Sequence, residues 1–271
     1  MNRDMFFGRY GLSTWFYVDR SLEEALVRIA EAGFRQVELW ADQAHLDPRK
    51  SPDIGAIKGL LRDLDLRVYS VHLPFSGMEL GSPDGALKDT WLRLAGAALE
   101  YCAQLGGQIA VVHVSGGRCL LDEERRKESV RLSIAFVQEL SLIAGRLGVR
   151  LALENLLQEW SQFGRTVGEL AQSFPDQEVG FCIDTGHALV NSADVAAELH
   201  GAGKRLLEVH ANNNDGVRDL HQLPWRGVLD WRRVEEYLVE LEYEGCRMLE
   251  VCGTGHPDVK LDQMRYLCEY I

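Results

Sequence analysis

A strand-like run, a polar loop and an amphipathic stretch recur in that order eight times along this chain of 271 residues. The runs are rich in Val, Ile and Leu and are apolar at most positions, which is typical of strands buried on both faces of a parallel sheet. They are YGLST (10–14), QVELW (36–40), RVYSVHL (67–73), IAVVHV (109–114), RLALENL (150–156), VGFCID (179–184), RLLEVHA (205–211) and RMLEVCG (247–253). Between them, segments such as residues 91–106 place apolar side chains at three- and four-residue spacing, which predicts helices.

This alternation of strand and helix predicts the fold class. Strands joined by helices form a parallel sheet with right-handed crossovers, and eight such units close a (β/α)8 barrel, the TIM barrel. A doubly wound open sheet is the alternative, but no GxGxxG motif follows the first run. No linker rich in Pro, Gly or Ser divides the chain, so we expect residues 1–271 to form a single TIM-barrel domain.

Charge and hydropathy exclude several classes of protein. The 29 Lys and Arg residues against 41 Asp and Glu give a formal charge of −12, which argues against a general nucleic-acid coat. No apolar run reaches the roughly 18 residues of a membrane span, and the N-terminus lacks a signal-peptide pattern. The six cysteines form no CxxC pair. We therefore expect a cytoplasmic protein without a membrane partner, whose cysteines are reduced and form neither disulfides nor a Cys-type zinc site.

Polar side chains collect at the C-terminal ends of the predicted strands, where the active site of a TIM barrel lies. They are His72, His113, Glu154, Asp184, His187, His210, Asp219, His221 and Glu250. A Glu within a run such as RLALENL is costly to bury unless it is paired or bound to a cation, and a metal ion is the simplest compensation for so many groups. Imidazole and carboxylate ligands suit Mn²⁺, Zn²⁺, Co²⁺ or Mg²⁺, and the number of histidines favours Zn²⁺ or Mn²⁺.

Other residues near the strand ends carry weaker signals for substrate binding. Glu38, in VELW, could face the barrel mouth or form a structural pair. Arg118 and Arg218 lie in loops on the same side and could bind an anionic group, although most loop arginines bind nothing. Four aromatic residues could stack on an apolar face of a ligand, although packing in the core is the simpler role: Trp15, Trp40, Phe75 and Trp225.

The order of these motifs resembles the xylose isomerase-like TIM barrels, which include sugar phosphate isomerases and epimerases and endonuclease IV. The motifs are HLP, HVSGG, LEN, DTGH, EVH followed by DLH and GVLDW, and LEV, and they span nearly the whole chain. The isomerase and epimerase branch implies that Glu154, Asp184, His210 and Glu250 bind the metal. It also implies that the two glutamates transfer protons through an enediolate and that His187 contacts a substrate hydroxyl or carbonyl.

The resemblance leaves a second activity open, a zinc-dependent phosphodiester hydrolase acting on abasic-site DNA. The endonuclease IV branch implies three Zn²⁺ ions held by nine residues, and each position has the matching residue type here: His72, His113, Glu154, Asp184, His187, His210, Asp219, His221 and Glu250. Equivalents of His72, His113 and His221 also occur in many members of the isomerase branch. The ligand set therefore does not separate the two activities.

Features outside the ligand set favour the isomerase or epimerase. A duplex substrate needs loops rich in cationic side chains, which a charge of −12 does not supply. The loops ENLLQEW and ANNNDGVRDLHQLPWRG also lack the longer segments of endonuclease IV. We therefore expect a small carbohydrate substrate rather than a nucleic acid. A barrel that binds metal or ligand without catalysis is a third alternative, which the complete ligand set disfavours, and the apolar outer helices allow a homo-oligomer.

Overall fold

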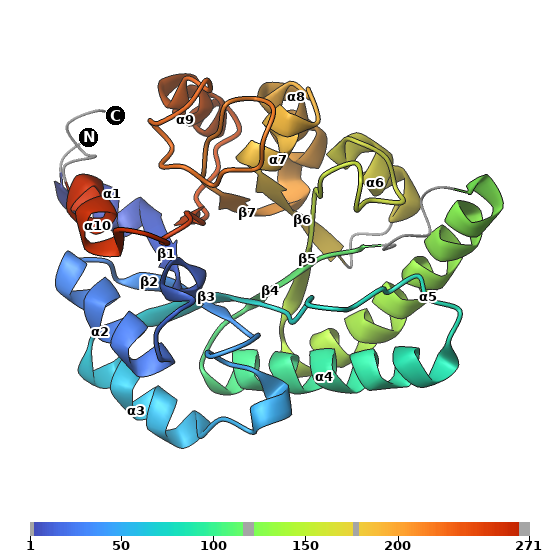
Figure 1. Cartoon of the computed structure of the whole chain (residues 1–271), viewed down its shortest axis with the longest axis horizontal. Helices are drawn as coiled ribbons and strands as arrows, with labels where there is room; N and C mark the ends of the chain where they lie inside the picture. Colours follow the sequence, from blue (N-terminus) through green and yellow to red (C-terminus); the bar gives the residue numbers. More distant parts are fainter. Residues whose placement is uncertain (1–2, 116–121, 176–178, 266–271) are drawn as a thin grey trace.

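The computed structural model describes residues 3–115, 122–175 and 179–265. Its eight strands are parallel and close a barrel in sequence order, with β8 paired to β1 (Figure 1). The strands are β1 Tyr10–Ser13, β2 Gln36–Trp40, β3 Arg67–His72, β4 Ile109–Val112, β5 Arg150–Glu154, β6 Val179–Asp184, β7 Leu206–His210 and β8 Arg247–Leu249. The predicted TIM barrel is confirmed.

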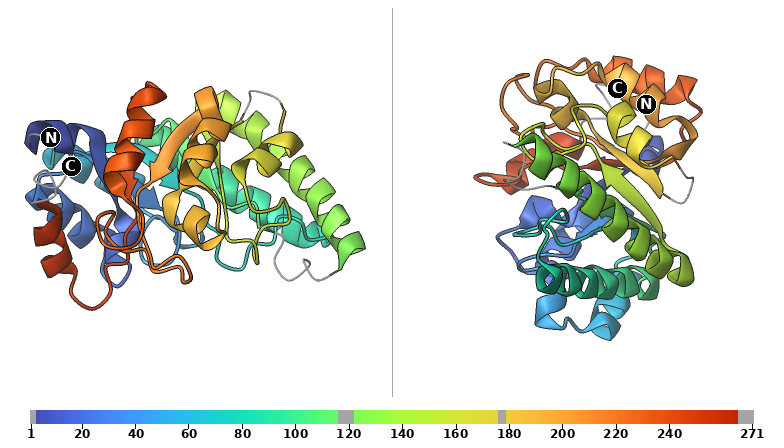
Figure 2. Two further views of the ribbon diagram at one scale, coloured as in Figure 1. Left: turned by 90° about the horizontal axis from the view of Figure 1, so that it is seen from above. Right: turned by 90° about the vertical axis from the view of Figure 1, so that its right-hand side faces the viewer.

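Helices connect the strands and surround the barrel (Figures 1 and 2). They are α1 Arg3–Arg9, α2 Leu22–Ala32, α3 Ile54–Asp63, α4 Gly85–Gln104, α5 Glu123–Leu147, α6 Val167–Ser173, α7 Thr185–Val190, α8 Val195–Ala202, α9 Trp231–Glu240 and α10 Pro257–Arg265, with the 3-10 helices η1 Thr14–Tyr17, η2 Pro48–Lys50 and η4 Gly203–Arg205. The two longest, α4 and α5, pack side by side. None of the described helices is long and apolar enough to cross a lipid bilayer.

Helix α2 shows how local sequence sets these elements. It begins where the Ser21 side chain accepts a hydrogen bond from the backbone N–H of Glu24, and it ends at Gly33, whose φ of 105° favours glycine. Leu22, Leu26 and Ile29 are buried, as their spacing along one helix face requires. The helix is therefore defined by a cap at each end and an apolar face against the barrel.

Alternate residues of each strand face either the helices or the barrel interior. Leu151 and Leu153 belong to the large apolar core, whereas Ala152 belongs to a small separate cluster with Val111 and Cys182. Glu154 continues the Ala152 side of β5, so its carboxylate lies on the interior side at the strand end. The same alternation brings polar residues of other strands to this rim.

Several strands are shorter at their C-terminal ends than the sequence predicts. The largest difference is at β8, predicted over residues 247–253 but ending at Leu249. Here the backbone N–H of Cys252 donates to the carbonyl oxygen of His221, 2.9 Å away, so the chain leaves the sheet and joins the loop that follows β7. Glu250 is consequently the first residue beyond the strand.

Four of the six cysteines lie in the part of the chain that the structure describes, and all four are free thiols. Cys102, Cys182 and Cys246 are buried with free thiols, and Cys252 is a partly exposed free thiol. Cys119 and Cys268 lie outside the described residues.

Candidate active site

The carboxyl ends of the strands place all nine predicted ligand residues at one rim of the barrel. His72, Glu154, Asp184 and His210 are the last residues of β3, β5, β6 and β7, His113 and Glu250 follow β4 and β8, His187 lies in α7, and Asp219 and His221 lie in the loop after β7. Of the nine, Asp219 has the most exposed side chain, at 28%. Their meeting follows from strand order, because parallel strands of a closed barrel end at the same rim.

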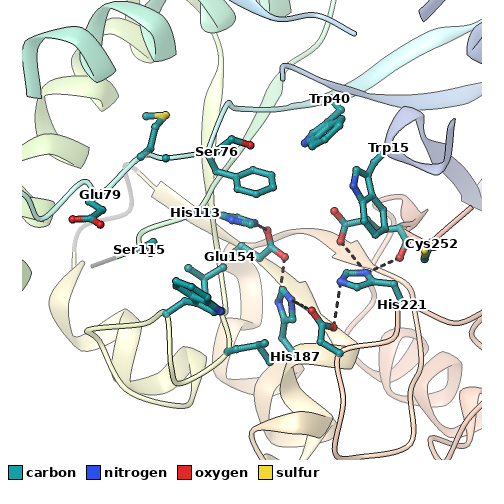
Figure 3. Close-up of a pocket in the computed structure, with 18 of the residues that line it drawn as sticks. Trp15, Trp40, Ser76, Glu79, His113, Ser115, Glu154, His187, His221 and Cys252 are labelled. Carbon is teal, nitrogen blue, oxygen red and sulfur yellow. Dashed lines mark hydrogen bonds and ion pairs between the residues drawn. The ribbon is translucent and has the colours of Figure 1, made fainter. Parts of the chain in front are cut away.

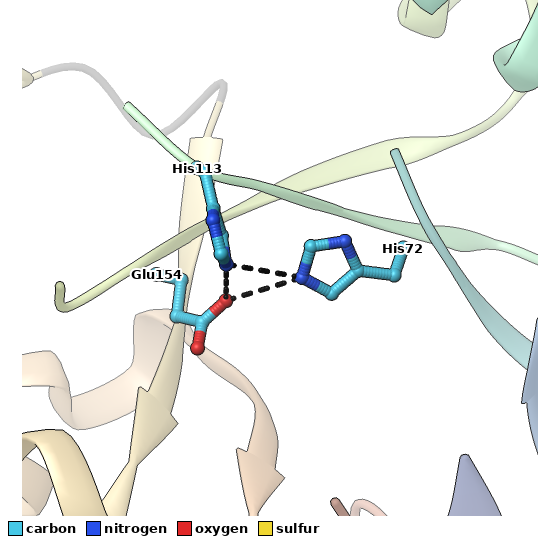
Figure 4. A group of neighbouring side chains, drawn as sticks. All are labelled: His72, His113 and Glu154. Atoms are coloured by element: carbon cyan, nitrogen blue, oxygen red, sulfur yellow. Dashed lines mark hydrogen bonds and ion pairs between the residues drawn. The ribbon is translucent and has the colours of Figure 1, made fainter. Parts of the chain in front are cut away.

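The first group of side chains is formed by His72, His113 and Glu154 (Figure 4). The Nε2 atoms of the two histidines are 3.1 Å apart, and they lie 3.4 and 2.8 Å from Oε2 of Glu154. Nδ1 of His72 is 3.0 Å from the carbonyl oxygen of Leu73, to which it can donate. That bond directs Nε2 of His72 toward the carboxylate.

The second group joins Glu154 and Asp184 to His210 and Glu250. Nδ1 of His210 lies 3.3 Å from Oε1 of Glu154 and 3.1 Å from Oε2 of Glu250. The carboxylate of Asp184 caps α7 by accepting from the backbone N–H of His187 at 2.7 Å, and it also accepts from the side-chain amide of Asn212 at 2.6 Å. Four charged or ionisable side chains are thus fixed within a few ångströms of one another.

The third group contains Asp184, His187 and His221. Asp219 connects its two histidines, with carboxylate oxygens 3.5 Å from Nε2 of His187 and 3.2 Å from Nε2 of His221. Nδ1 of His187 faces the backbone carbonyl of Asn155 at 2.9 Å. Because Glu154 and Asp184 each belong to two groups, the three groups form one continuous cluster.

Burial and neighbouring charges shift the pKa values of these residues in opposite directions. Burial alone would raise the pKa of Glu250, but the charge of His210 outweighs it and holds that pKa at about 2. His113 and His210 likewise keep the pKa of Glu154 well below its usual value despite burial. For Asp184, burial dominates and raises the pKa to about 6. In the protein without metal, Glu154 and Glu250 are therefore ionised at neutral pH.

The histidines respond to the same carboxylates. Burial would lower the pKa of His72, but the nearby carboxylates of Glu154, Glu38 and Glu250 raise it to about 9. Burial is also outweighed at His187, where Asp184 and Asp219 raise the pKa to about 9. The protons on these imidazoles thus balance the negative charge of the carboxylates, as a bound cation would.

The residues of the cluster fit a divalent cation. Oε2 of Glu154 is buried and accepts no hydrogen bond of good geometry, although two imidazole nitrogens lie close to it. An unsatisfied buried carboxylate oxygen is costly, and a cation would satisfy it. In each of the three groups, one ligand atom per residue lies within 4.8 Å of the others, and imidazole and carboxylate are ligands of Mn²⁺, Zn²⁺ and Co²⁺.

We expect the apparent affinity for a divalent metal to rise with pH up to about 9. A cation bound to Glu154 would repel the proton on the neighbouring imidazole of His72, which holds that proton below a pKa of about 9. Each proton released should strengthen binding about tenfold per pH unit below that pKa. Calorimetric titration with Mn²⁺ at several pH values, in two buffers of different ionisation enthalpy, measures both affinity and proton release. Affinity that does not change with pH would contradict this account.

A cavity of about 650 Å³ opens over the cluster (Figure 3). Its polar end is formed by His113, Glu154, His187, Asp219, His221 and Glu250, and its apolar wall includes Trp15, Trp40, Phe75, Leu156, Leu157 and Trp160. The Phe75 ring lies 4.4 Å from that of His113, and the Trp15 ring lies 5.0 Å from that of His221. None of the described residues that line the cavity is Lys or Arg. The cavity has the size and apolar lining of a small-molecule site.

The structure places the weaker sequence candidates in different surroundings. Trp15 lines the cavity, but Glu38 is fully buried beneath it and does not contribute to its wall. Arg218 is exposed, forms an ion pair with Asp215 at 2.8 Å, and does not line the cavity. Trp225 packs against the apolar core. Arg118 lies outside the described residues.

Several residues around the site were not found from the sequence. Asn155 and Asn212 hold Asp184, and Trp160 contributes to the cavity wall. Glu208 lies fully buried in β7, and burial raises its pKa well above the usual value. A signal for Glu208 was available, because it precedes His210 by two residues and so faces the same side of the strand.

Fold and site together define a TIM barrel with a buried cluster of histidines and carboxylates at the mouth. The chain belongs to the xylose isomerase-like TIM barrel family, whose model matches residues 26–270.

Relatives share the fold along most of the chain. An uncharacterized protein of Methanocaldococcus jannaschii is 27% identical over 250 residues, which cover 89% of this chain and 83% of that protein. A D-tagatose 3-epimerase-like protein matches with a TM-score of 0.84 at 24% identity, covering 97% of this chain and 96% of the other. The D-psicose 3-epimerase from Clostridium cellulolyticum H10 matches with a TM-score of 0.77 at 17% identity, covering 97% of both. At these identities the structural likeness establishes the fold.

Proposed function

We propose that this protein is a divalent-metal-dependent isomerase or epimerase of a small sugar or sugar phosphate. The observation that carries the proposal is the position of Glu154 and Glu250, two ionised carboxylates from β5 and the end of β8, at the polar end of a cavity of small-molecule size. Epimerases among the structural neighbours, one of D-psicose and one resembling a D-tagatose enzyme, support the same class of reaction.

We assign the metal to Glu154, Asp184, His210 and Glu250, whose ligand atoms lie within 4.8 Å of one another. A Mn²⁺, Zn²⁺, Co²⁺ or Mg²⁺ ion bound there would polarise a substrate carbonyl and stabilise negative charge on two adjacent oxygens. The set supplies three carboxylates and one imidazole. That composition suits a hard or intermediate divalent ion and does not select one of the four.

Glu154 and Glu250 would transfer the protons. One carboxylate removes the proton from the carbon next to the carbonyl, which gives an enediolate, and the other carboxyl group returns a proton to the opposite face or to the neighbouring carbon. The carboxylate that gives a proton back to the substrate must first be protonated itself. His187 holds one at neutral pH, and its Nδ1 lies 3.4 Å from Oε1 of Glu154. His187 is therefore placed to supply a proton to Glu154 and to contact a substrate hydroxyl or carbonyl.

The residues that line the cavity favour a carbohydrate as the substrate. Aromatic rings such as those of Trp15, Phe75 and Trp160 offer flat faces against which the C–H face of a sugar can pack, while its hydroxyls face the polar end. Arg218, the loop arginine singled out from the sequence, is committed to Asp215 rather than to the cavity. The cavity thus offers an apolar wall for the C–H face of a sugar and a polar end for its hydroxyls.

A zinc-dependent nuclease for abasic DNA is the second candidate, and one observation favours it. All nine residues of the endonuclease IV set meet in one cluster, and its three groups share Glu154 and Asp184, as three neighbouring ions would require. A DNA duplex also requires cationic contacts to its phosphates. The described wall of the cavity provides none from Lys or Arg, so we favour the sugar enzyme.

The test is turnover of a panel of ketoses and ketose phosphates with Mn²⁺ in deuterated water, followed by NMR. Proton transfer through ionised carboxylates predicts that product carries deuterium at the carbon whose configuration or oxidation state changes. The same preparation is assayed on abasic-site DNA with Zn²⁺. Incision of the DNA without conversion of any sugar would overturn the proposal.

A further inference from the structure

A second layer of polar side chains lies beneath the candidate metal ligands, inside the barrel. Glu38 of β2, Ser70 of β3 and Glu208 of β7 are each 0% exposed. Oγ of Ser70 lies 3.3 Å from Oε2 of Glu38 and 2.7 Å from Oε1 of Glu208. None of the three lines the cavity. Substrate therefore does not reach them, and they act on the site through other residues.

His210 connects this layer to the cluster above it. Its Nδ1 faces Glu154 and Glu250, at 3.3 and 3.1 Å, while its Nε2 lies 3.2 Å from Oε2 of Glu38. A neutral imidazole carries its hydrogen on one nitrogen and a lone pair on the other. When Nε2 donates its hydrogen to Glu38, the lone pair of Nδ1 points at the carboxylates to which we assign the metal.

We propose that Glu38 is a positioning residue that fixes the ring orientation and tautomer of His210, and thereby strengthens metal binding at Nδ1. Oγ of Ser70 contacts the same carboxylate oxygen of Glu38 as Nε2 of His210 does, and so helps to hold that oxygen in place. A carboxylate that accepts from a metal-binding histidine orients the ring and makes it a better ligand. The inference rests on the proposed function in one respect, that His210 binds a metal.

The same side chains admit another reading, in which Glu38, Glu208 and His210 hold an ion of their own. Oε1 of Glu38 and Oε2 of Glu208 are buried without a hydrogen-bond partner, and an ion would satisfy them. The geometry nevertheless favours positioning, because a single Nε2 atom of His210 faces this layer and Glu38 occupies it.

The experiment compares Mn²⁺ binding to the wild-type protein and to Glu38→Gln. The expected result is a dissociation constant about 10- to 100-fold higher, the range found when such supporting carboxylates are lost. The visible spectrum of the Co²⁺-loaded protein should also change, because the orientation of a ligand ring changes. Ser70→Ala, which keeps the carboxylate but removes its support, should raise the dissociation constant less, by about 2- to 10-fold.

Glu235→Gln is the matched control. Glu235 is also a buried glutamate, but it pairs with Arg247 and Tyr10 at the opposite rim, where β8 and β1 begin. We expect this control to lower the melting temperature of the metal-free protein and to leave the Mn²⁺ dissociation constant and the Co²⁺ spectrum unchanged. A loss of stability alone therefore does not reproduce the effect expected at Glu38.

Different results would contradict the positioning role of Glu38 and the proposed metal site. Wild-type affinity and spectrum in both Glu38→Gln and Ser70→Ala would overturn the positioning role and leave the metal site intact. Loss of one bound ion per chain in Glu208→Gln would overturn it in favour of a separate ion in the deeper layer. A wild-type protein that binds no Mn²⁺ would contradict the proposed function and the inference together.

Discussion

Replacing Glu154 or Glu250 with Gln is expected to lower turnover by about 10²- to 10⁴-fold, the usual contribution of general acid–base catalysis. Each substitution keeps the size of the side chain and removes the group that accepts or returns a proton. Both residues are ionised in the metal-free protein, Glu250 with a pKa of about 2, so at neutral pH each is in the form that accepts a proton. The measurement is kcat for each variant on the sugar identified in the substrate panel.

The control for these variants is Glu198→Gln. Glu198 is likewise buried, but it accepts a hydrogen bond from the backbone of Val167 and lies outside the site, so activity should be retained. Because both catalytic candidates are also assigned to the metal, bound metal and near-ultraviolet circular dichroism must be measured for each variant. Wild-type turnover in both Glu154→Gln and Glu250→Gln would remove these residues from the mechanism.

Chelation of the metal should abolish turnover and lower the melting temperature by about 5–10 °C. A ligand present at 100 times its dissociation constant stabilises the folded state by about 2.7 kcal/mol, which corresponds to a shift of that order in a chain of this length. Differential scanning calorimetry before and after chelation, and after adding back Mn²⁺, Zn²⁺, Co²⁺ or Mg²⁺ in turn, measures the effect. It also identifies the ions that restore activity.

Asp184→Asn provides the comparison for chelation. Asp184 is fully buried and offers a carboxylate oxygen to two of the three ligand groups, so its loss should weaken metal binding throughout the cluster. The melting temperature of this variant should respond little to the chelator. If the chelated wild-type protein keeps its activity and its melting temperature, no metal is needed.

The fold was predictable because eight repeats of strand and helix leave few arrangements for a parallel sheet. The convergence of the nine polar residues was predictable for the same reason, since strands of a closed barrel end at one rim. That these residues bind a metal ion stays a prediction. The strand ends were less predictable, because residues such as Cys252 are apolar and yet pair with a loop rather than with the sheet.

The second layer of polar side chains, Glu38, Ser70 and Glu208, was harder to predict than the residues at the rim of the barrel. The sequence left Glu38 open between the barrel mouth and a structural pair, because the depth of a strand-end carboxylate in the barrel does not follow from the strand pattern. In the structure it lies beneath His210, and its depth depends on the register between β2 and β3, which shifts at Val37 and Glu38. The extent of the cavity depends on loops such as the one carrying Trp160, whose course the strand pattern does not determine.

Elemental analysis of the purified protein, before and after reconstitution with divalent ions, tests the central claim most directly. The assignment of the metal to Glu154, Asp184, His210 and Glu250 predicts about one tightly bound ion of Mn, Zn, Co or Mg per chain. Three zinc ions per chain would contradict the sugar enzyme in favour of the nuclease. No ion even after reconstitution would contradict a metal centre altogether.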